Sequence, residues 1–496
     1  MRRRKGRWLV AVAAVLGLVA AACGGDDDSD AAAPEDMDDA EVADEAPELD
    51  FDMSGTIDGE DVRVLTIDTP EAPGPPELNR VQVLQHGPPD AENVLVLVPG
   101  TSAGAGYFSP VALDLVDELP GWQVWSVDRR ENALEDHSVR AQRFEDDGIP
   151  AEEVWNYYVE WIVDDSIGDH FEPQGGTGSD DETVAFARDW GMNVAIDDLR
   201  AVIEEAKSLG GEVVLGGHSL GGSISVAYAT WDFDGRPGAE DLSGLVLIDG
   251  GGSAGGATTV EEAEQQLAEL EEGSPFNDIG FGIPWIPGVL NALGSSAVLL
   301  EPDAPNVAWE SSLLPDNLKP EQQPTNVGQY GFALDGDTAP ENLDLVKLHM
   351  GELDKSQEPW GWTNNELVSV QRAARMFSGP EGLPEIDGTA WYHPQRLNID
   401  SGAVNFGNEN PAQEVLDVRA IHGDKLDFPV YALATTFGGD GVLAIPGILA
   451  EQSGIPEDDL TLVDETDRLF HTDPLAIDTE QNPLRETLVP FLDAIG

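Results

Sequence analysis

The segment Val213–Ser223, "VVLGGHSLGGS", constrains the fold more than any other part of the chain. It joins a short apolar run to a helical pattern through Ser219, which lies at the centre of a G-x-S-x-G pattern. A serine in this context requires a sharp turn between a buried strand and a helix, and the glycines allow neighbouring backbones to approach closely. The pattern also surrounds Ser102 and Ser253, and a chain with 54 glycines in 496 residues produces chance matches. The surroundings of each serine therefore decide its interpretation.

Ser219 is the serine whose surroundings fit a nucleophile, because a helical pattern begins at the next residue. Ser102 also follows an apolar run, but a glycine-rich stretch separates it from the next helix. We therefore predict that the backbone N–H of Thr101 or Ser102 joins that of Leu220 in an oxyanion hole. Ser102 as the nucleophile stays the alternative. Ser253, in "DGGGSAGG", is interpreted as a flexible entry to the segment that follows.

Apolar runs of strand length alternate with helical patterns through the first half of the chain and again at its end. The runs include "NVLVLVPG", "WQVWSVD", "EVVLGG", "LSGLVLID" and "FPVYALA". This alternation predicts an α/β fold with a mainly parallel sheet and helices on both of its faces. We predict that residues 55–250 and 428–496 form this core. Residues 251–427, which are rich in proline and tryptophan, are predicted to form a large inserted and mostly helical cap.

The turn "GGHSLGG" resembles the nucleophile turn of lipases and esterases in the α/β-hydrolase superfamily. "VLVLVPGTSAGAGYF", "VWSVDRRENALED" and "LFHTDPLA" are similar to strand–loop segments of the same superfamily, although its usual His-Gly before the oxyanion loop is Pro99-Gly100 here. The resemblance covers about residues 61–249 and 428–496. It implies a serine hydrolase that cleaves carboxylic esters through an acyl-enzyme, and the N-terminal segment described below adds that it is exported. An amidase or peptidase with the same residues, and a binding lipoprotein without turnover, are the alternatives.

The resemblance also implies the chain order of nucleophile, acid and histidine base. His471 is the histidine that lies between the last predicted strand and the final helix, so we predict that it is the base. Asp440, in "TTFGGDG", follows a predicted strand by a short loop and is the predicted acid, whereas Asp249 at the end of the preceding strand is the alternative. His218 is interpreted as a packing residue, because side chains on either side of a sharp turn diverge.

The cap is predicted to supply a pocket for the acyl or alcohol group of the substrate. Its apolar segment "GFGIPWIPGVLNALG" and its tryptophans are the residues expected in the lining. These tryptophans are Trp285, Trp309, Trp360 and Trp362.

The N-terminus has the pattern of a targeting segment. Residues 1–22 combine a basic start, the apolar run "LVAVAAVLGLVA" and small residues before Cys23, and they predict a signal peptide. Cys23 is the only cysteine, and its position resembles the lipidation site of bacterial lipoproteins. Ordinary cleavage without lipidation is the alternative. Residues 23–54, acidic and without periodicity, are predicted to be a disordered tether. We therefore expect an extracytoplasmic protein that is anchored to the outer face of the bacterial membrane by lipid alone.

The charge limits which partners the protein can bind. With 95 acidic and 25 basic residues, the formal net charge is −70, and such a surface repels nucleic-acid backbones. The sequence contains no H-E-x-x-H or cysteine-based metal motif and no phosphate-binding G-x-x-x-x-G-K-[ST] motif. We therefore predict no metal, no cofactor and no nucleic acid, and a small-molecule or lipid ester as the partner.

Overall fold

The computed structural model describes residues 49–145, 148–175, 182–252, 257–279 and 281–496. The predicted signal peptide, Cys23, most of the predicted tether and Ser253 lie outside the described residues. The first strand begins at Met53, shortly before the predicted start of the core at residue 55. Within the described residues, no helix is long and apolar enough to cross a membrane.

A nine-stranded sheet forms the centre of the molecule, in the order β1-β2-β3-β5-β4-β6-β9-β12-β13. The pairs among β1, β2 and β3 and the β3–β5 pair are antiparallel, and all the pairs from β5 to β13 are parallel. The predicted fold class, an α/β fold with a mainly parallel sheet, is therefore confirmed. The strands are β1 (Met53–Ile57), β2 (Glu60–Asp68), β3 (Arg80–His86), β4 (Asn93–Val98), β5 (Trp122–Asp128), β6 (Val213–His218), β9 (Gly244–Ile248), β12 (Val430–Ala434) and β13 (Leu460–Asp464).

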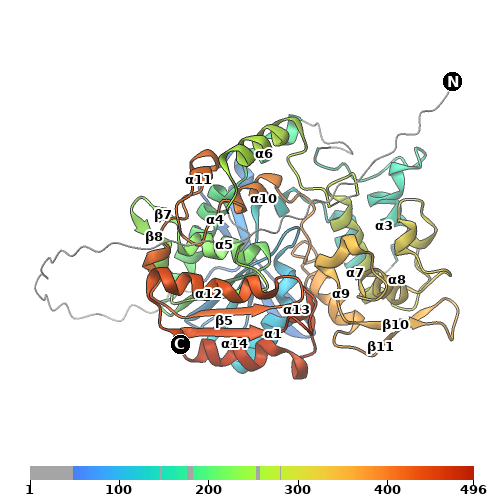
Figure 1. Cartoon of the computed structure of the whole chain (residues 1–496). Coiled ribbons are helices and arrows are strands. Elements are labelled where there is room, and N and C mark those ends of the chain that lie inside the picture. Colours follow the sequence, from blue (N-terminus) through green and yellow to red (C-terminus); the bar gives the residue numbers. More distant parts are fainter. Residues whose placement is uncertain (1–48, 146–147, 176–181, 253–256, 280) are drawn as a thin grey trace, which may run out of the picture.

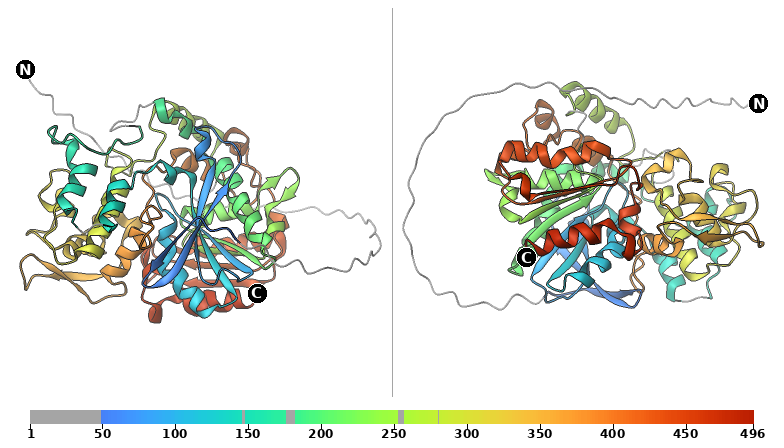
Figure 2. Two further views of the ribbon diagram at one scale, coloured as in Figure 1. Left: turned by 180° about the vertical axis from the view of Figure 1, so that it is seen from behind. Right: turned by 60° about the horizontal axis from the view of Figure 1, so that its bottom comes forward.

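Helices cover both faces of the sheet, as Figure 2 shows. Alternate side chains of β4 divide between the two faces: Val94, Val96 and Val98 belong to one apolar cluster, and Leu95 and Leu97 to the other. This is the two-residue period of a strand buried on both faces, and it explains the continuous apolar run in the sequence. The first cluster packs against α4 (Met192–Ser208), α5 (Leu220–Ala229) and α12 (Gly439–Ser453), and the second against α1 (Ser109–Glu118), α13 (Asp473–Ala476) and α14 (Pro483–Asp493).

A helical lobe lies beside one edge of this layered core (Figure 1). Two chain segments build it, one between β5 and α4 and one between β9 and β12, whereas the sequence pattern predicts a cap made of the second segment alone. The first segment contributes α2 (Ser138–Glu145) and α3 (Ala151–Tyr158), and the second contributes α7 (Ile286–Leu300), α8 (Asn326–Leu334), α9 (Val370–Ser378) and the hairpin β10 (Gly351–Asp354) and β11 (Gly361–Asn364). We call this lobe the cap lobe.

The remaining helices of the second segment lie on the core itself. They are α6 (Val260–Glu272), α10 (Gln395–Ser401) and α11 (Pro411–Leu416), and α10 packs against α4 and α5 (Figure 1). A short hairpin of β7 (Asp232–Phe233) and β8 (Arg236–Pro237) follows α5. The inserted segment therefore both covers the core and forms most of the cap lobe.

The strand order creates a switch point at β4. The chain leaves β4 for β5 on one side and later returns to β6 on the other side. In an open parallel sheet, the crevice at the carboxyl ends of two such strands is where ligands bind. The loops after β4, β6, β9 and β13 all start at this edge, because these strands run in the same direction.

Candidate active site

Ser219 occupies the sharp turn between β6 and α5 that the sequence predicted. Its backbone has φ 57° and ψ −124°, a conformation that costs a non-glycine residue about 1–3 kcal/mol. The N–H of Ser219 donates to the carbonyl of Ile248 at 3.1 Å and ties the turn to β9. A Cβ atom on Gly221 would lie 1.9 Å from the carbonyl oxygen of Val98, and one on Gly217 would lie 2.2 Å from the Gly221 backbone. These contacts explain why glycine is needed on both sides of Ser219.

His471 and Asp249 form a buried hydrogen-bonded pair near this turn. The distance from His471 Nδ1 to Asp249 Oδ2 is 2.5 Å, and the two residues are each 2% exposed. Asp249 follows β9 directly, and His471 lies in the loop between β13 and α13. Ser219 and His471 line the same cavity. The pairing through Nδ1 leaves Nε2 as the ring nitrogen that is available to act as a base.

The Asp249 carboxylate is held by three further donors. Thr435 donates its N–H to Oδ1 at 2.7 Å and its hydroxyl to Oδ2 at 2.5 Å, and the N–H of Gly438 donates to Oδ1 at 3.2 Å. Burial opposes the charged form of Asp249, but the hydrogen bonds from His471 and Thr435 outweigh it and lower the pKa of the carboxyl below its usual value. The carboxylate is thus ionised and fixed in orientation.

The hydrogen bond that the sequence analysis assigned to Asp440 is made by Asp249, and this is a correction. Asp440 is exposed in the first turn of α12, where a carboxylate interacts favourably with the positive end of the helix. The loop before α12 contributes the backbone donors of Thr435 and Gly438 to the site and contributes no acid.

His218 supports His471 in a way that the sequence did not indicate. Its Nε2 donates to the carbonyl of His471 at 2.8 Å, and its Nδ1 accepts from the Tyr107 hydroxyl at 3.2 Å. A carbonyl oxygen only accepts, so the proton resides on Nε2. Burial, with a smaller effect of His471, lowers the pKa of His218 to about 3 and keeps its ring neutral. His218 therefore fixes the backbone of His471.

The loop after β4 contains the predicted oxyanion donors and passes beside Ser219. A Cβ on Gly100 would lie 3.0 Å from the Ser219 Cβ. The backbone N–H groups of Thr101, Ser102 and Leu220 have no hydrogen-bond partner in the described part of the chain. Ser102 has φ 55°, and its carbonyl accepts from the N–H of Ala390 in the inserted segment at 3.0 Å. Backbone N–H groups of the loop after β4 and of the start of α5, the two parts of the predicted oxyanion hole, therefore have no partner among the described residues.

Arg129, which is buried after β5, anchors the carbonyl groups of this loop. Its guanidinium donates to the carbonyls of Pro99 at 2.7 Å and Gly100 at 3.1 Å, and it pairs with buried Glu131 at 2.7 Å. A planar guanidinium can satisfy several acceptors in one fixed geometry. Because it occupies the carbonyl side of the loop, Arg129 orients the peptide groups next to Ser219. No local sequence pattern indicates this role.

Asp128 anchors the next part of the loop. Its Oδ1 accepts from the N–H of Ala105 at 2.8 Å and from the Asn132 side chain at 2.7 Å. Burial raises the pKa of Asp128 to about 7, although both hydrogen bonds favour the charged form. Complete burial and engagement in the loop indicate a structural role for this carboxyl.

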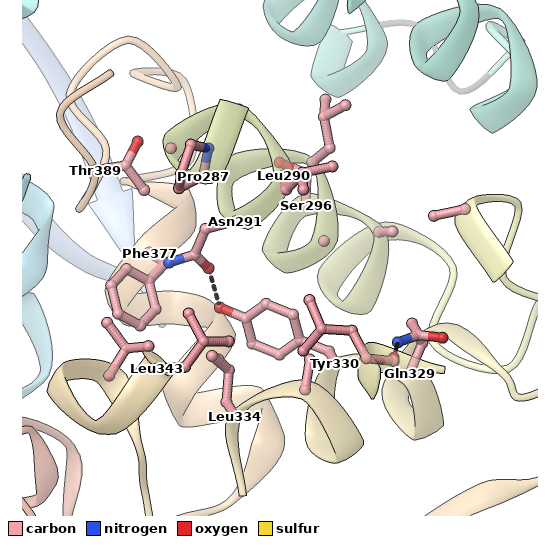
Figure 3. Close-up of a pocket in the computed structure, with 18 of the residues that line it drawn as sticks. Pro287, Leu290, Asn291, Ser296, Gln329, Tyr330, Leu334, Leu343, Phe377 and Thr389 are labelled. Carbon is pink, nitrogen blue, oxygen red and sulfur yellow. Dashed lines mark hydrogen bonds between the residues drawn. The ribbon is translucent and has the colours of Figure 1, made fainter. Parts of the chain in front are cut away.

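A cavity of about 210 Å³ extends from Ser219 into the cap lobe. The predicted segment of α7 does line it, with Pro287, Leu290 and Leu293 among the lining residues. The four cap tryptophans do not, and this prediction is wrong. Trp285 instead packs in the apolar cluster inside the cap lobe, and the tryptophan in the lining is Trp155, from the first segment. Figure 3 shows part of the lining, with Asn291 and Tyr330 joined by a hydrogen bond among apolar side chains.

No protein-family model and no curated protein matches the sequence. Solved structures do resemble the fold over most of its length, at low identity. A candidate lipase from Sulfolobus solfataricus matches at 15% identity and a TM-score of 0.44, covering 91% of this chain and 98% of that protein. A thermophilic esterase from Thermogutta terrifontis matches at 14% identity and a TM-score of 0.38, covering 87% and 98%. Epoxide hydrolase A from Mycobacterium thermoresistibile matches at 12% identity and a TM-score of 0.38, again covering 87% and 98%.

Proposed function

We propose that the protein is a serine hydrolase that cleaves carboxylic esters, with Ser219 as nucleophile, His471 as base and Asp249 as acid. The observation that carries this proposal is the buried hydrogen bond from His471 Nδ1 to Asp249, beside a serine held in a strained strand-to-helix turn. A serine hydroxyl is a weak nucleophile until a base oriented by a third group accepts its proton. The arrangement of these three residues supports that chemistry.

In the proposed reaction, His471 Nε2 accepts the proton of the Ser219 hydroxyl while Oγ attacks the ester carbonyl. The N–H of Leu220 and that of Thr101 or Ser102 stabilise the oxyanion of the tetrahedral intermediate. Its collapse breaks the carbon–oxygen bond of the ester, and the protonated His471 gives its proton to the departing alcohol. Water, which gives a proton to His471 in the same way, then attacks the acyl-enzyme, releases the carboxylic acid product and restores the Ser219 hydroxyl. The ionised Asp249 stabilises the imidazolium that forms twice in this cycle.

The first test is hydrolysis of p-nitrophenyl esters by the purified protein. Ser219→Ala should reduce kcat by about 10⁶ or to background, as expected when a nucleophile is removed. Ser102→Ala is the matched control, because it removes the second candidate hydroxyl and retains the backbone N–H of the oxyanion loop. Activity that survives in Ser219→Ala, or that is lost only in Ser102→Ala, would refute the assignment.

Two further measurements separate the alternatives. A fluorophosphonate labels only an activated serine, so a binding protein without turnover would not react. Matched p-nitroanilide substrates test the amide alternative, and we expect esters to react faster by at least a hundredfold. Equal or greater activity on amides would change the proposed substrate class while leaving the roles of Ser219, His471 and Asp249 unchanged.

We also propose export and lipid attachment at Cys23, on the sequence pattern of residues 1–23. Wild-type protein should partition with membranes of the producing cell. Cys23→Ala should release the protein or block its processing. Wild-type protein found wholly in the medium would contradict the anchor.

A further inference from the structure

Asn291 presents a side-chain amide to the cavity from α7. Its Oδ1 accepts from the Tyr330 hydroxyl at 2.7 Å, and among the described residues its Nδ2 has no hydrogen-bond partner. Asn291 and Tyr330 both line the cavity, and Figure 3 shows the amide directed away from α7 toward Tyr330. An amide nitrogen carries two hydrogens, each of which can donate to an acceptor. The cavity therefore contains a donor that the described residues leave unpaired.

This donor can be reached from inside the cavity. Between Pro287 and Ala297, every residue of α7 that is partly accessible also lines the cavity. The accessible face of this part of α7 is therefore the face that opens into the cavity, and Asn291 lies in its middle. Its Nδ2 is not among the unpaired side-chain atoms that are closed to solvent. A water molecule or a ligand oxygen can thus approach it.

The donor is present whichever way the amide is oriented. In the observed orientation, the Tyr330 hydroxyl donates to Oδ1 of Asn291, and both hydrogens of Nδ2 remain free. In the flipped orientation, Nδ2 would donate one hydrogen to the Tyr330 oxygen, and the second N–H and the tyrosine O–H would remain free. Both orientations leave donor hydrogens for a ligand. We call Asn291 and Tyr330 the donor pair.

Other polar side chains of the lining are engaged in its walls. Arg140 donates to the Ser296 hydroxyl at 2.9 Å. Asn306 donates to the Asn326 side chain at 3.0 Å, and Asn326 in turn donates to the carbonyl of Glu301 at 2.8 Å. The donating side chains are all buried. The amide of the donor pair differs from them because it is both accessible and without a partner for its nitrogen.

The donor pair lies toward the catalytic end of the cavity. Gly288, one turn before Asn291, packs against Trp391, and the residue before Trp391 donates its N–H to the loop after β4. Leu300, at the other end of α7, lies about 13 Å farther along the helix axis, because an α-helix rises 1.5 Å per residue. A chain that enters the cavity from Ser219 therefore meets the donor pair before it reaches the far end.

Apolar side chains make up most of the remaining lining, including Leu290, Leu334, Leu343 and Phe377 (Figure 3). Such a lining suits a hydrocarbon chain. A dry cavity of about 150 Å³ holds benzene, so one of about 210 Å³ takes roughly eight to ten non-hydrogen atoms. A chain of about eight atoms matches this size.

We infer that the cavity binds an ester chain of medium length that contains an ether or carbonyl oxygen, and that the donor pair donates a hydrogen bond to this oxygen. The inference rests on the proposed ester hydrolysis and adds to it the class of substrate. Water satisfies the donor in the empty cavity. A plain hydrocarbon chain displaces this water and leaves the donor unpaired, whereas a correctly placed oxygen restores the hydrogen bond.

The kinetic test compares p-nitrophenyl octanoate with four esters in which oxygen replaces the methylene at carbon 3, 4, 5 or 6. An ether oxygen and a methylene are similar in size, so the comparison isolates hydrogen bonding. The informative quantity is the kcat/KM ratio of ether to plain ester within each variant, because differences in intrinsic reactivity cancel between variants. For at least one oxygen position, this ratio should fall about tenfold in Asn291→Leu/Tyr330→Phe. Both residues are changed because the Tyr330 hydroxyl alone could still donate.

A second set of substrates, heptyl acetate and its ether analogues, places the same chain on the alcohol side of the ester. Hydrolysis is followed by the acid that is released. The ratio should fall in the set whose chain occupies the cavity. If Asn291→Leu/Tyr330→Phe leaves the ratio unchanged at every oxygen position in both sets, a retained water satisfies the donor pair and the inference is refuted.

The matched control is Asn156→Leu/Tyr157→Phe. The same two residue types are changed on α3 in the same lobe, but neither residue lines the cavity. Its ratios should equal those of the wild type. Thermal melting checks that both double variants are folded.

A binding measurement separates this inference from the proposed reaction. Trp155 lines the cavity, so tryptophan fluorescence of Ser219→Ala can report the binding of heptane and of its isosteres dipropyl ether and butyl ethyl ether. The ether-to-heptane affinity ratio should fall about tenfold when Asn291→Leu/Tyr330→Phe is added. If no ester is hydrolysed by any variant but this ratio falls, the proposed reaction fails and the donor pair stands. If esters are hydrolysed but neither ratio responds, the donor pair fails alone.

Discussion

Replacing Asp249 by asparagine tests the proposed acid with little change in shape. Two backbone donors, the N–H groups of Thr435 and Gly438, point at the Oδ1 position at 2.7 and 3.2 Å. They will hold the amide oxygen of an asparagine there. The amide nitrogen must then occupy the Oδ2 position, which lies 2.5 Å from His471 Nδ1.

An amide nitrogen donates and cannot accept, so Asp249→Asn forces His471 to accept at Nδ1 and to carry its proton on Nε2. This tautomer cannot remove the proton of Ser219. In the best-studied serine protease, the same change lowers kcat by about 10⁴. At about 1.36 kcal/mol for each tenfold, this is a loss of roughly 5 kcal/mol in transition-state stabilisation. We expect a comparable loss here.

The assay is kcat with p-nitrophenyl butyrate, together with the rate of fluorophosphonate labelling and a thermal melt. Both rates should fall in Asp249→Asn while the fold persists. Asp440→Asn is the matched control, and because Asp440 is exposed on α12 its kcat should stay within about twofold of the wild type. Retention of more than a tenth of the activity in Asp249→Asn, or inactivation by Asp440→Asn instead, would refute the reasoning.

Three further predictions concern the surroundings of the site. Arg129→Lys should lower kcat by about 10- to 100-fold with little change in KM, because an ammonium cannot anchor the carbonyls of both Pro99 and Gly100. An unchanged kcat would exclude a positioning role for Arg129. Burial disfavours the charged form of His349, but its 2.6 Å hydrogen bond to Asp473 raises its pKa. The protonated ring therefore stabilises the fold below the unfolded pKa of about 6.5, and this stability is lost as pH rises through the folded pKa. The melting temperature should therefore fall as the pH rises from the unfolded pKa through the folded pKa of His349, and this fall should be smaller in His349→Gln. Identical pH profiles of the melting temperature in the two proteins would contradict this role of His349. Gly221→Ala should lower the free energy of unfolding by several kcal/mol, because its Cβ would overlap a backbone oxygen 1.9 Å away. Gly447→Ala is the control, because a Cβ there meets open space within α12, and it should raise the free energy of unfolding by about 0.5–1 kcal/mol. Urea unfolding measures both changes.

The parts of the site that could be predicted from sequence are those with a local signature. Ser219 was placed correctly on its turn because strand, glycines and helix are contiguous in the chain. His471 is predicted to be the base from its place before the final helix, and in the structure it pairs with a carboxylate. The parallel sheet followed from apolar runs such as β4, whose side chains are buried on both faces.

The choice between the two aspartates could not be made from sequence, because Asp249 and Asp440 each follow a parallel strand. The glycines before Asp440 suggested a free loop, but α12 begins at Gly439 and makes this aspartate part of the first helical turn. The role of Arg129 depends on the alignment of β5 beside β4, which no local pattern encodes. Trp155 lines the cavity only because α3, from a distant part of the chain, joins the cap lobe.

The hydrogen bonds between the inserted segment and the loop after β4 have a consequence for engineering. The N–H of Ala390 holds Ser102, and the carbonyl of Asp387 accepts from Gly106 at 2.9 Å. Deleting residues 251–427 would therefore remove most of the cavity lining and the hydrogen bonds that hold the loop after β4. Chimeras that exchange residues 301–369 and retain 376–391 should acquire new selectivity while keeping turnover. We therefore expect the boundary between interchangeable and indispensable sequence to lie inside the insertion and not at its ends.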